Sequence, residues 1–358
     1  MRHTNSPLPP LGAGRMLGGK FEIVGVLGEG ATGIVYDARR VVEGDRVALK
    51  VIHQHLAGDT QIRGRFTREA TILRRLQGSH LCPILDFGEA SDPRHEGAGL
   101  MYMALPRIDG SALDAVLREE RPLSIARAVA IVLDVCEALS EAHAQGVIHR
   151  DLKPGNVLLL EGDHAVVVDF GMAKIMTGGG TGTTALTQHN MVFGTPEYMA
   201  PEQARGDELD ARCDVYATGV ILYELLTGSV PFVGNSPLSV LTAHLTSAPQ
   251  PPRERAPDRE ISPALEAVVL HAMAKNPARR YATASALATA IRAASVGPQD
   301  VVTVRPPRVY GVADTTGART ATSASQPLSS TSGWLLVCIL AALAGIALGA
   351  WLSMHLDR

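Results

Sequence analysis

The chain has 358 residues, a hydrophobic content of 46% and a formal net charge of −3. This length accommodates one large domain with additional segments, and this apolar content is enough to fill a sizeable core. The nearly balanced charge argues against bulk attraction to nucleic acid or to an anionic membrane surface, so no nucleic-acid partner is expected. None of the four cysteines forms a CxxC pair. Their spacing supports neither a zinc site nor a disulfide framework, and it favours a reducing compartment.

The chain opens with residues 1–20, which are rich in Pro and Gly and are predicted to form a flexible tail. They contain no apolar run, so no signal peptide is expected. A strand begins at Phe21 and leads into three glycines with the spacing GxGxxG, namely Gly28, Gly30 and Gly33. Dinucleotide-binding folds use the same spacing, but there a helix follows the last glycine. Here the β-branched residues 34–36 continue as a strand, which favours a hairpin folded over phosphate groups.

The next predicted strand, residues 46–52, carries Lys50 between apolar neighbours, unlike an ordinary surface lysine. A helical pattern follows and places Glu69 on its flank, nineteen residues after Lys50. A strand over residues 100–105 then leads to a short connection, residues 106–110. Beyond it, Ser124 is a plausible N-cap for a helix with one apolar stripe.

The most informative stretch is HRDLKPGN at 149–156, followed by DFG at 169–171. It holds two carboxylates, an ammonium and an amide at fixed offsets, on Asp151, Asp169, Lys153 and Asn156. Phosphoryl transfer requires this set: a carboxylate that accepts the proton of the attacking hydroxyl, a cation, and oxygen ligands for metal ions. The alternative is a surface turn followed by a hairpin.

Further motifs follow in order. A Thr- and Gly-rich loop ends in GTPEYMAPE at 194–202, and residues 214–228 form a helix that is apolar nearly all round and therefore expected to be buried. The stretch KNPARRY occupies 275–281.

Together these motifs resemble the Hanks-type protein kinases, with VALK standing where the family has VAIK. The resemblance covers residues 21–295 and implies an α+β, two-lobed fold. A small lobe of antiparallel sheet and one helix would span 21–105, a hinge 106–110, and a larger, mostly helical lobe 111–295. The chain looks most similar to bacterial serine/threonine kinases that have a cytoplasmic kinase domain and one membrane span.

The resemblance also assigns catalytic roles. Asp151 would accept the proton of the hydroxyl, and Lys153, which marks the serine/threonine kinases, would neutralise charge on the transferred group. Asn156 and Asp169 would hold Mg²⁺, or Mn²⁺ in its place, against ATP. Thr195 would bond Asp151 and Lys153 and seat the acceptor hydroxyl of a protein substrate.

For the nucleotide, Lys50 would bridge two phosphates and be held by an ion pair with Glu69. Leu105 would be the gatekeeper. Pro106 and Arg107 depart from the family pattern, which has Glu and an aromatic residue there. The residues expected to contact the nucleotide are Leu27, Gly28, Gly30, Gly33, Val35, Ala48, Lys50, Ile108, Leu158 and Asp169.

The resemblance implies regulation and support as well. Arg150 would belong to a basic pocket for a phosphothreonine, so activation-loop autophosphorylation is expected. Asp214 would bond the backbone of the catalytic loop, and Arg280 would pair with Glu202. The alternative for the loop is that its threonines are merely linker-like. The candidate acceptors are Thr181, Thr183, Thr184 and Thr187.

After the kinase region, residues 296–333 are predicted to be a disordered juxtamembrane linker. Residues 334–352 are nineteen uncharged residues with a Trp at each end, long enough for a transmembrane helix, and 353–358 form a short tail. The alternative is a buried C-terminal helix of a soluble domain, which would normally show a polar face. Use of ATP places the kinase domain on the cytoplasmic side of the inner membrane. A homodimer would form through the kinase domain or through the small residues Ala341, Gly345 and Gly349.

Two other functions were weighed. A membrane-anchored pseudokinase scaffold would lack Lys50, Asp151 or Asp169, and all three are present. A small-molecule phosphotransferase, such as an aminoglycoside kinase, shares the lobe plan. The loop at 194–202 favours a protein acceptor instead.

Overall fold

The structure is a computed structural model and describes residues 10–30, 32–53, 56, 60–91, 99–172, 175 and 195–295. Within these ranges, no helix combines the length and the apolar character needed to cross a membrane. Several predictions lie outside the described residues: the first nine residues of the tail, the candidate acceptors Thr181, Thr183, Thr184 and Thr187, and the segments 296–333, 334–352 and 353–358.

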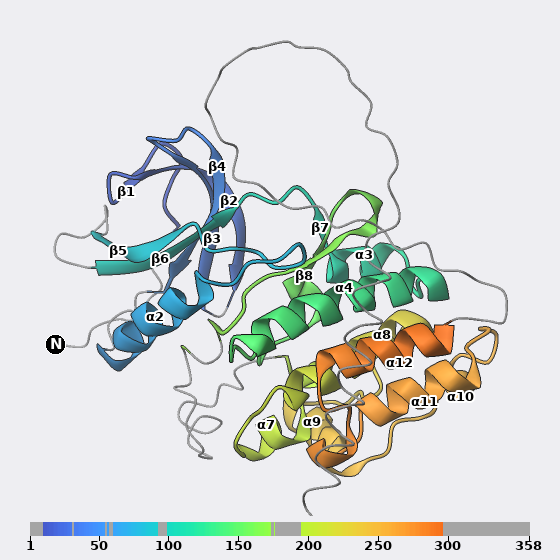
Figure 1. The fold of residues 1–358 in the computed structure, drawn as a ribbon. Coiled ribbons are helices and arrows are strands. Elements are labelled where there is room, and N and C mark those ends of the chain that lie inside the picture. The colour runs from blue at the N-terminus through green and yellow to red at the C-terminus, as the bar shows by residue number, and fades with distance from the viewer. Residues whose placement is uncertain are drawn as a thin grey trace, which may run out of the picture. The chain divides into compact units, whose positions relative to one another are not determined.

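The small lobe is built on a six-stranded sheet whose neighbouring strands all run antiparallel (Figure 1). In spatial order the strands are β1 (Met16–Leu17), β2 (Phe21–Gly30), β3 (Gly33–Arg40), β4 (Arg46–Ile52), β6 (Gly99–Pro106) and β5 (Asp86–Ser91). The sheet and the accompanying helix agree with the fold expected from the resemblance.

The N-terminal tail is the first correction. Residues 16–17 form β1 and pair with the start of β2, and Leu17 is fully buried. Leu11 is buried as well, and its backbone N–H donates to the Tyr36 hydroxyl at 2.9 Å. These two leucines complete the small-lobe cluster that contains Phe21. The prediction of a flexible tail over residues 1–20 is therefore wrong for residues 11–17, because two leucines among Pro and Gly were enough to anchor the segment.

Helix α2 (Thr60–Leu73) covers one face of the sheet (Figure 1). Its buried side chains recur at intervals of three or four residues, which places them on one face of the helix. Phe66 packs edge-on against Phe87 of β5, with ring centroids 6.3 Å apart. The buried residues are Ile62, Phe66, Ala70 and Leu73.

The large lobe is mostly helical. Its α-helices are α3 (Leu113–Glu119), α4 (Ile125–Ala144), α7 (Pro201–Arg205), α8 (Arg212–Thr227), α9 (Pro237–Thr246), α10 (Pro252–Arg255), α11 (Pro263–Ala272) and α12 (Ala284–Ser295). Single 3₁₀ turns are η1 (Pro154–Asn156), η2 (Glu161–Asp163), η3 (Pro196–Tyr198) and η4 (Pro277–Arg279). A three-stranded sheet, β7 (Ser111–Ala112), β8 (Val157–Leu159) and β9 (Ala165–Val167), lies beside the helices.

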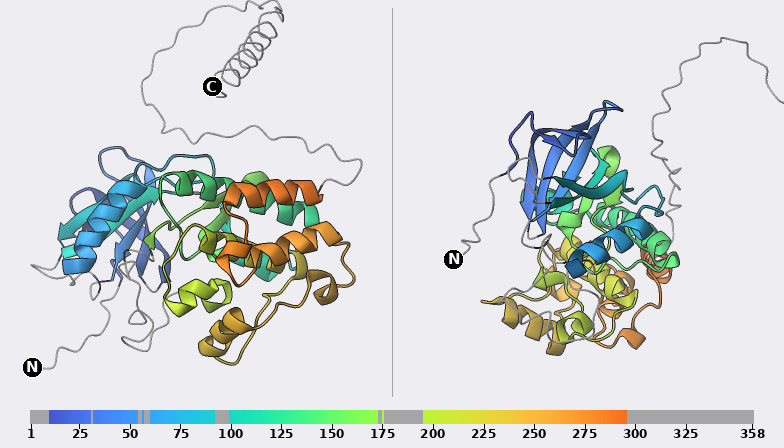
Figure 2. Two further views of the ribbon diagram at one scale, coloured as in Figure 1. Left: turned by 60° about the horizontal axis from the view of Figure 1, so that its bottom comes forward. Right: turned by 90° about the vertical axis from the view of Figure 1, so that its left-hand side faces the viewer.

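Helix α8 is the centre of the large lobe. Every residue from Cys213 to Leu226 is buried, as expected for a helix that is apolar nearly all round. Helices α4, α11 and α12 pack on it, and Figure 2 shows α12 alongside α4. The expected N-cap of α4 is present, because the Ser124 hydroxyl accepts the backbone N–H of Arg127 at 3.3 Å.

One hydrophobic cluster runs through both lobes. It includes Phe66 of α2, Met103 of β6, Leu139 of α4 and Val220 of α8. The loop that follows α2 also reaches β9, where Leu81 forms a parallel bridge with Val167. The segments that would carry the chemistry are therefore attached to a shared core.

Candidate active site

The catalytic loop brings together three residues that the sequence places within six positions. Lys153 Nζ lies 3.0 Å from Asp151 Oδ2. The 3₁₀ turn η1 folds Asn156 back, so that its Nδ2 donates to the backbone oxygen of Asp151 at 2.7 Å. A carboxylate, an ammonium and an amide thus share one small region, each about two-thirds or more buried.

Asp214, in the first turn of α8, holds the backbone of the catalytic loop at residues 149–150. Its carboxylate accepts the backbone N–H groups of His149 at 2.8 Å and Arg150 at 2.9 Å, and the imidazole of His143 at 2.8 Å. Burial raises the pKa of Asp214, but the hydrogen bond and charge of His143, with His149 and the Arg150 amide, outweigh burial and lower it below the usual value. The expected bond from Asp214 to the loop backbone is confirmed. Arg150 sits at φ 69°, a left-handed conformation that these contacts hold in place.

Asp169 follows β9 and meets Lys50 of β4. Lys50 Nζ lies 2.7 Å from Asp169 Oδ2, and the lysine side chain is 6% exposed. Burial raises the pKa of Asp169, but the charge and hydrogen bond of Lys50, aided by His149 and Lys153, outweigh it and lower the pKa below the ordinary value. The carboxylate is therefore ionised at neutral pH.

The metal-binding end of the site is tied to the catalytic loop through the backbone. The Val168 N–H donates to the Asn156 oxygen at 3.0 Å, and His149 Nε2 donates to the Val168 oxygen at 2.9 Å. Asn156 and Asp169 thus lie on two connected segments, and both offer oxygen atoms. Hard oxygen ligands of this kind suit Mg²⁺ or Mn²⁺, so the residues present fit the expected metal.

Glu69 does not play the expected part here. Within the described residues, the ion pair of Lys50 is with Asp169 and not with Glu69. The carboxylate of Asp169, at 2.7 Å, is the anion that compensates the buried ammonium here. Helix α2 is tied to the segment after DFG by Arg65, whose Nε donates to the Ile175 oxygen at 3.0 Å.

The three glycines of the β2–β3 hairpin differ in their surroundings. A Cβ added at Gly28 or Gly30 would meet nothing within 4 Å, whereas one at Gly33 would lie 2.2 Å from the Val51 oxygen. The first two positions leave the backbone open to a ligand. Gly33 also has a packing role, since only glycine lets β3 approach β4 so closely.

The residues expected to contact the adenine ring include Val35 of β3, Ala48 of β4 and Leu158 of β8. Ala48 pairs across the sheet with Leu105, and Val35 pairs with Lys50. Leu158 is half-buried on β8. Arg107, one of the two hinge residues that depart from the family pattern, makes a contact of its own. Its Nη1 donates to the backbone oxygen of Ile108 at 2.7 Å. The backbone oxygen of Ile108, a residue expected to contact the nucleotide, is thus already engaged by the chain itself.

The loop at 195–202, where the resemblance places the protein substrate and which is called the substrate loop below, is anchored by buried charges. Arg280 and Glu202 form a two-pronged pair at 2.6 and 2.7 Å with side chains 0% and 5% exposed, which confirms the expected pairing. Among the described residues, no hydrogen bond joins Thr195 to Asp151 or Lys153, so that expectation is not met. Lys153 is bonded directly to the Asp151 carboxylate instead.

Sequence reasoning missed three contacts around this loop. Gln203 Nε2 donates to the Arg150 oxygen at 2.7 Å and so ties the substrate loop to the catalytic loop. The Tyr198 hydroxyl donates to Glu224 at 2.5 Å, and Arg121 binds the other oxygen of that carboxylate at 2.9 Å. For the two contacts of Glu224, the only available signal was an acidic residue within the apolar C-terminal half of α8, and nothing in the sequence indicated the Gln203 contact.

Comparison with known proteins gives consistent results. The family described as "Protein kinase domain" matches residues 21–290. The chain is 44% identical over 284 residues to the serine/threonine-protein kinase pkn3 of Myxococcus xanthus, covering 78% of this chain and 51% of that protein. It is 39% identical over 269 residues to PknB of Mycolicibacterium smegmatis, covering 75% of this chain and 42% of PknB.

Among solved structures, the PknI kinase domain of Mycobacterium tuberculosis superposes with a TM-score of 0.62 at 27% identity. That superposition covers 80% of this chain and all of the PknI domain. The matched region thus spans about half the length of pkn3 and less than half of PknB.

Proposed function

This chain belongs to the protein kinase family, and from that premise we propose that it transfers the γ-phosphoryl group of ATP to serine or threonine hydroxyls of proteins. The observation that carries the proposal is the convergence of Asp151, Lys153 and Asn156 in one loop, next to the Lys50–Asp169 pair. Phosphoryl transfer in this family depends mainly on positioning and electrostatics, and these residues provide both.

Each residue has a defined task. Asp151, held in place through the loop backbone, accepts the proton of the acceptor hydroxyl. Lys153, 3.0 Å from that carboxylate, stabilises negative charge that develops beside it. Lys50 supplies a second, buried cation at the nucleotide side. Asn156 and Asp169 would hold the divalent metal, which would neutralise phosphate charge when bound.

The test uses the full chain with labelled ATP and Mg²⁺, in parallel with Lys50→Ala and Asp151→Asn. We expect phosphoserine or phosphothreonine on the wild type and a loss of about 10²–10⁴-fold in Asp151→Asn, the usual contribution of a positioned base. Asp258→Asn, an exposed aspartate far from the site, is the matched control and should retain full activity. An inactive wild type that still binds nucleotide would favour the alternative, a membrane-anchored pseudokinase scaffold.

We further propose activation by phosphorylation within residues 181–187. The support is Arg150, whose Nε is buried and has no hydrogen-bond partner among the described residues. A phosphate would satisfy this guanidinium and order the loop. Mass spectrometry of active enzyme should find phosphate on Thr181, Thr183, Thr184 or Thr187. Replacing all four with Ala should lower activity, whereas Thr289→Ala on α12 should not.

Membrane attachment is also a proposal. The uncharged segment 334–352 would anchor the chain in the cell membrane, leaving the kinase domain cytoplasmic, where ATP is available. Pairing through its small residues, or through the kinase domain, would raise the local concentration for phosphorylation between copies. Fractionation should place the full chain with membranes and a chain ending at residue 333 in the soluble fraction. Equal distribution of the two would refute this anchor.

A further inference from the structure

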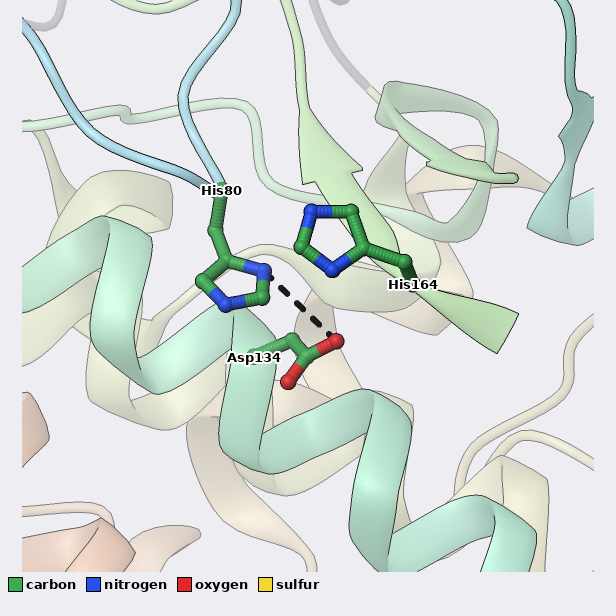
Figure 3. A group of neighbouring side chains, drawn as sticks. All are labelled: His80, Asp134 and His164. Atoms are coloured by element: carbon green, nitrogen blue, oxygen red, sulfur yellow. Dashed lines mark ion pairs between the residues drawn. The ribbon is translucent and has the colours of Figure 1, made fainter. Parts of the chain in front are cut away.

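A second cluster of chemically reactive side chains lies away from the catalytic loop. His80, in the loop after α2, faces Asp134 of α4 and His164 at the start of β9 (Figure 3). One ligand atom from each residue lies within 4.8 Å of the other two. His80 Nδ1 is 3.5 Å from Asp134 Oδ2, and the two imidazole rings lie 4.4 Å apart.

The surroundings of the cluster orient both rings. His164 Nε2 donates to the Ser79 oxygen at 2.9 Å, which leaves its other nitrogen on the side of Asp134, as Figure 3 shows. Glu137, one turn along α4, places Oε2 3.9 Å from His80 Nε2. Metal-bound histidines characteristically donate their second ring N–H to a carbonyl or carboxylate. His164 has such an acceptor in the Ser79 oxygen, and for His80 the Glu137 carboxylate lies near Nε2 but beyond hydrogen-bond distance.

We propose that His80, Asp134 and His164 form a binding site for a zinc-class divalent metal ion. Two imidazoles and a carboxylate are a common zinc ligand set, with a fourth position for water. Tetrahedral zinc keeps its ligand atoms about 3.4 Å apart, so closing the site requires shifts of about 1 Å. Mg²⁺ prefers oxygen ligands, which separates this site from the metal site at Asp169.

Binding changes one hydrogen bond in a defined way. In this structure His80 Nδ1 donates to the Ala165 oxygen at 2.7 Å. When Nδ1 binds the metal, the ring proton moves to Nε2, and Glu137 accepts it once its carboxylate closes the present distance of 3.9 Å. The carboxylate of Asp134 keeps its bond from the Ala165 N–H at 3.0 Å. The imidazole thus exchanges a backbone partner for a carboxylate partner without leaving a buried donor unpaired.

The site would join three segments that also carry the kinase machinery. His80 follows α2, Asp134 lies on α4, and His164 immediately precedes β9, the strand that leads to Asp169. A metal ion here would cross-link the loop after α2 to the large lobe. The proposal does not rest on kinase activity, because it concerns the placement of these side chains only.

The experiment titrates the untagged full chain with Co²⁺ and Zn²⁺ while Mg²⁺ in large excess fills the oxygen-ligand sites. We expect one equivalent of Co²⁺ with the absorption of a four-coordinate ion, displaced by Zn²⁺, and a higher melting temperature with Zn²⁺. His164→Asn should lose all three effects. Glu137→Gln should weaken binding about 10-fold or more, as expected for loss of an outer partner.

His271→Asn removes an exposed histidine elsewhere and should behave as wild type. Thermal melting without metal checks that each variant is folded. The Co²⁺ spectrum of the wild type tests metal binding directly, whether or not the variants fold. No stoichiometric uptake by the wild type would overturn the proposal. Unchanged uptake in folded His164→Asn would also overturn it, since the metal would then occupy another site.

Discussion

Charged side chains in the large lobe and on the nucleotide side of the molecule differ in how many partners they have and in how exposed those partners are. In the large lobe, the Arg280–Glu202 pair and Asp214 are almost completely buried, and the hydrogen bonds described above surround them. On the nucleotide side, Lys50 is held by one contact to Asp169, whose side chain is 28% exposed. The first group keeps the catalytic and substrate loops in position. The second is left within reach of solvent and of a ligand.

This difference follows from what each group must do. A buried charge with all its partners can be moved only at a large free-energy cost, so it suits a part that stays fixed. A pair that reorganises when nucleotide and metal bind must be easier to open. Lys50 is as buried as Arg280, so the contrast teaches that the number of partners around a buried charge, and not burial alone, distinguishes support from chemistry in this fold.

The largest effect is expected from Glu202→Ala, which leaves Arg280 buried and uncompensated. We expect the free energy of unfolding to fall by about 3–5 kcal/mol, measured by urea denaturation. Arg205→Ala breaks a neighbouring pair whose side chains are 43% and 52% exposed, and it should cost less than about 1 kcal/mol. Similar losses in the two variants would remove the distinction between buried and exposed pairs.

The next effect concerns His244, which is fully buried in the large lobe. Burial, aided by the charge of Lys275, lowers the pKa of His244 to about 4. The unfolded chain therefore binds a proton near pH 6.5 that the folded protein does not bind. Stability is complete above that pH and falls as the pH drops towards 4, by on the order of 3 kcal/mol in total.

His244→Asn tests this prediction, because it removes the titrating group. The variant should lose less unfolding free energy than the wild type between pH 7 and pH 5, again measured with urea. His271→Asn, on the surface, should follow the wild type. Parallel curves for all three proteins would show that His244 does not control the pH dependence.

A smaller effect is expected within the nucleotide hairpin. Gly33→Ala would place a Cβ 2.2 Å from the Val51 oxygen, so β3 and β4 must separate, at about 1–3 kcal/mol. Gly28→Ala meets no atom within 4 Å and should change stability by no more than about 0.5 kcal/mol. Its effect should appear in nucleotide affinity instead. Thermal melting and a nucleotide-binding titration separate the two outcomes.

A small stability effect is also expected from Lys50→Met. The variant removes a cation but keeps an apolar side chain of similar length, and water can reach Asp169. We expect the unfolding free energy to change by less than about 1 kcal/mol while kinase activity is lost. A loss as large as that of Glu202→Ala would place the Lys50–Asp169 pair among the structural anchors and contradict the contrast drawn above.

Much of the fold and of the candidate site could be predicted from the sequence, because these parts rest on local signals. The apolar character of α8, the cap at Ser124 and the alternation in β2 each lie within one short stretch. The catalytic loop is also local, since Asp151, Lys153 and Asn156 are close in the chain.

The rest depends on contacts between distant residues. The partner of Lys50 is decided by whether Glu69 or Asp169 comes closer, and both are plausible in the sequence. The bond from Gln203 to the catalytic loop links positions 53 residues apart. The cluster of His80, Asp134 and His164 has no local spacing at all. The burial of Leu11 was hidden by the Pro and Gly around it.

Strand β1 has a practical consequence for anyone who shortens the chain. The match to the protein kinase family begins at residue 21. A fragment designed from that match alone would therefore start at residue 21 and omit β1. Such a fragment exposes the backbone at the start of β2, on a strand that already presents Val24 and Val26 at 42% and 50% exposure. An unpaired, apolar edge invites another chain to add to the sheet. The segment before Phe21 therefore protects this edge from aggregation, and it belongs in any fragment meant to remain monomeric.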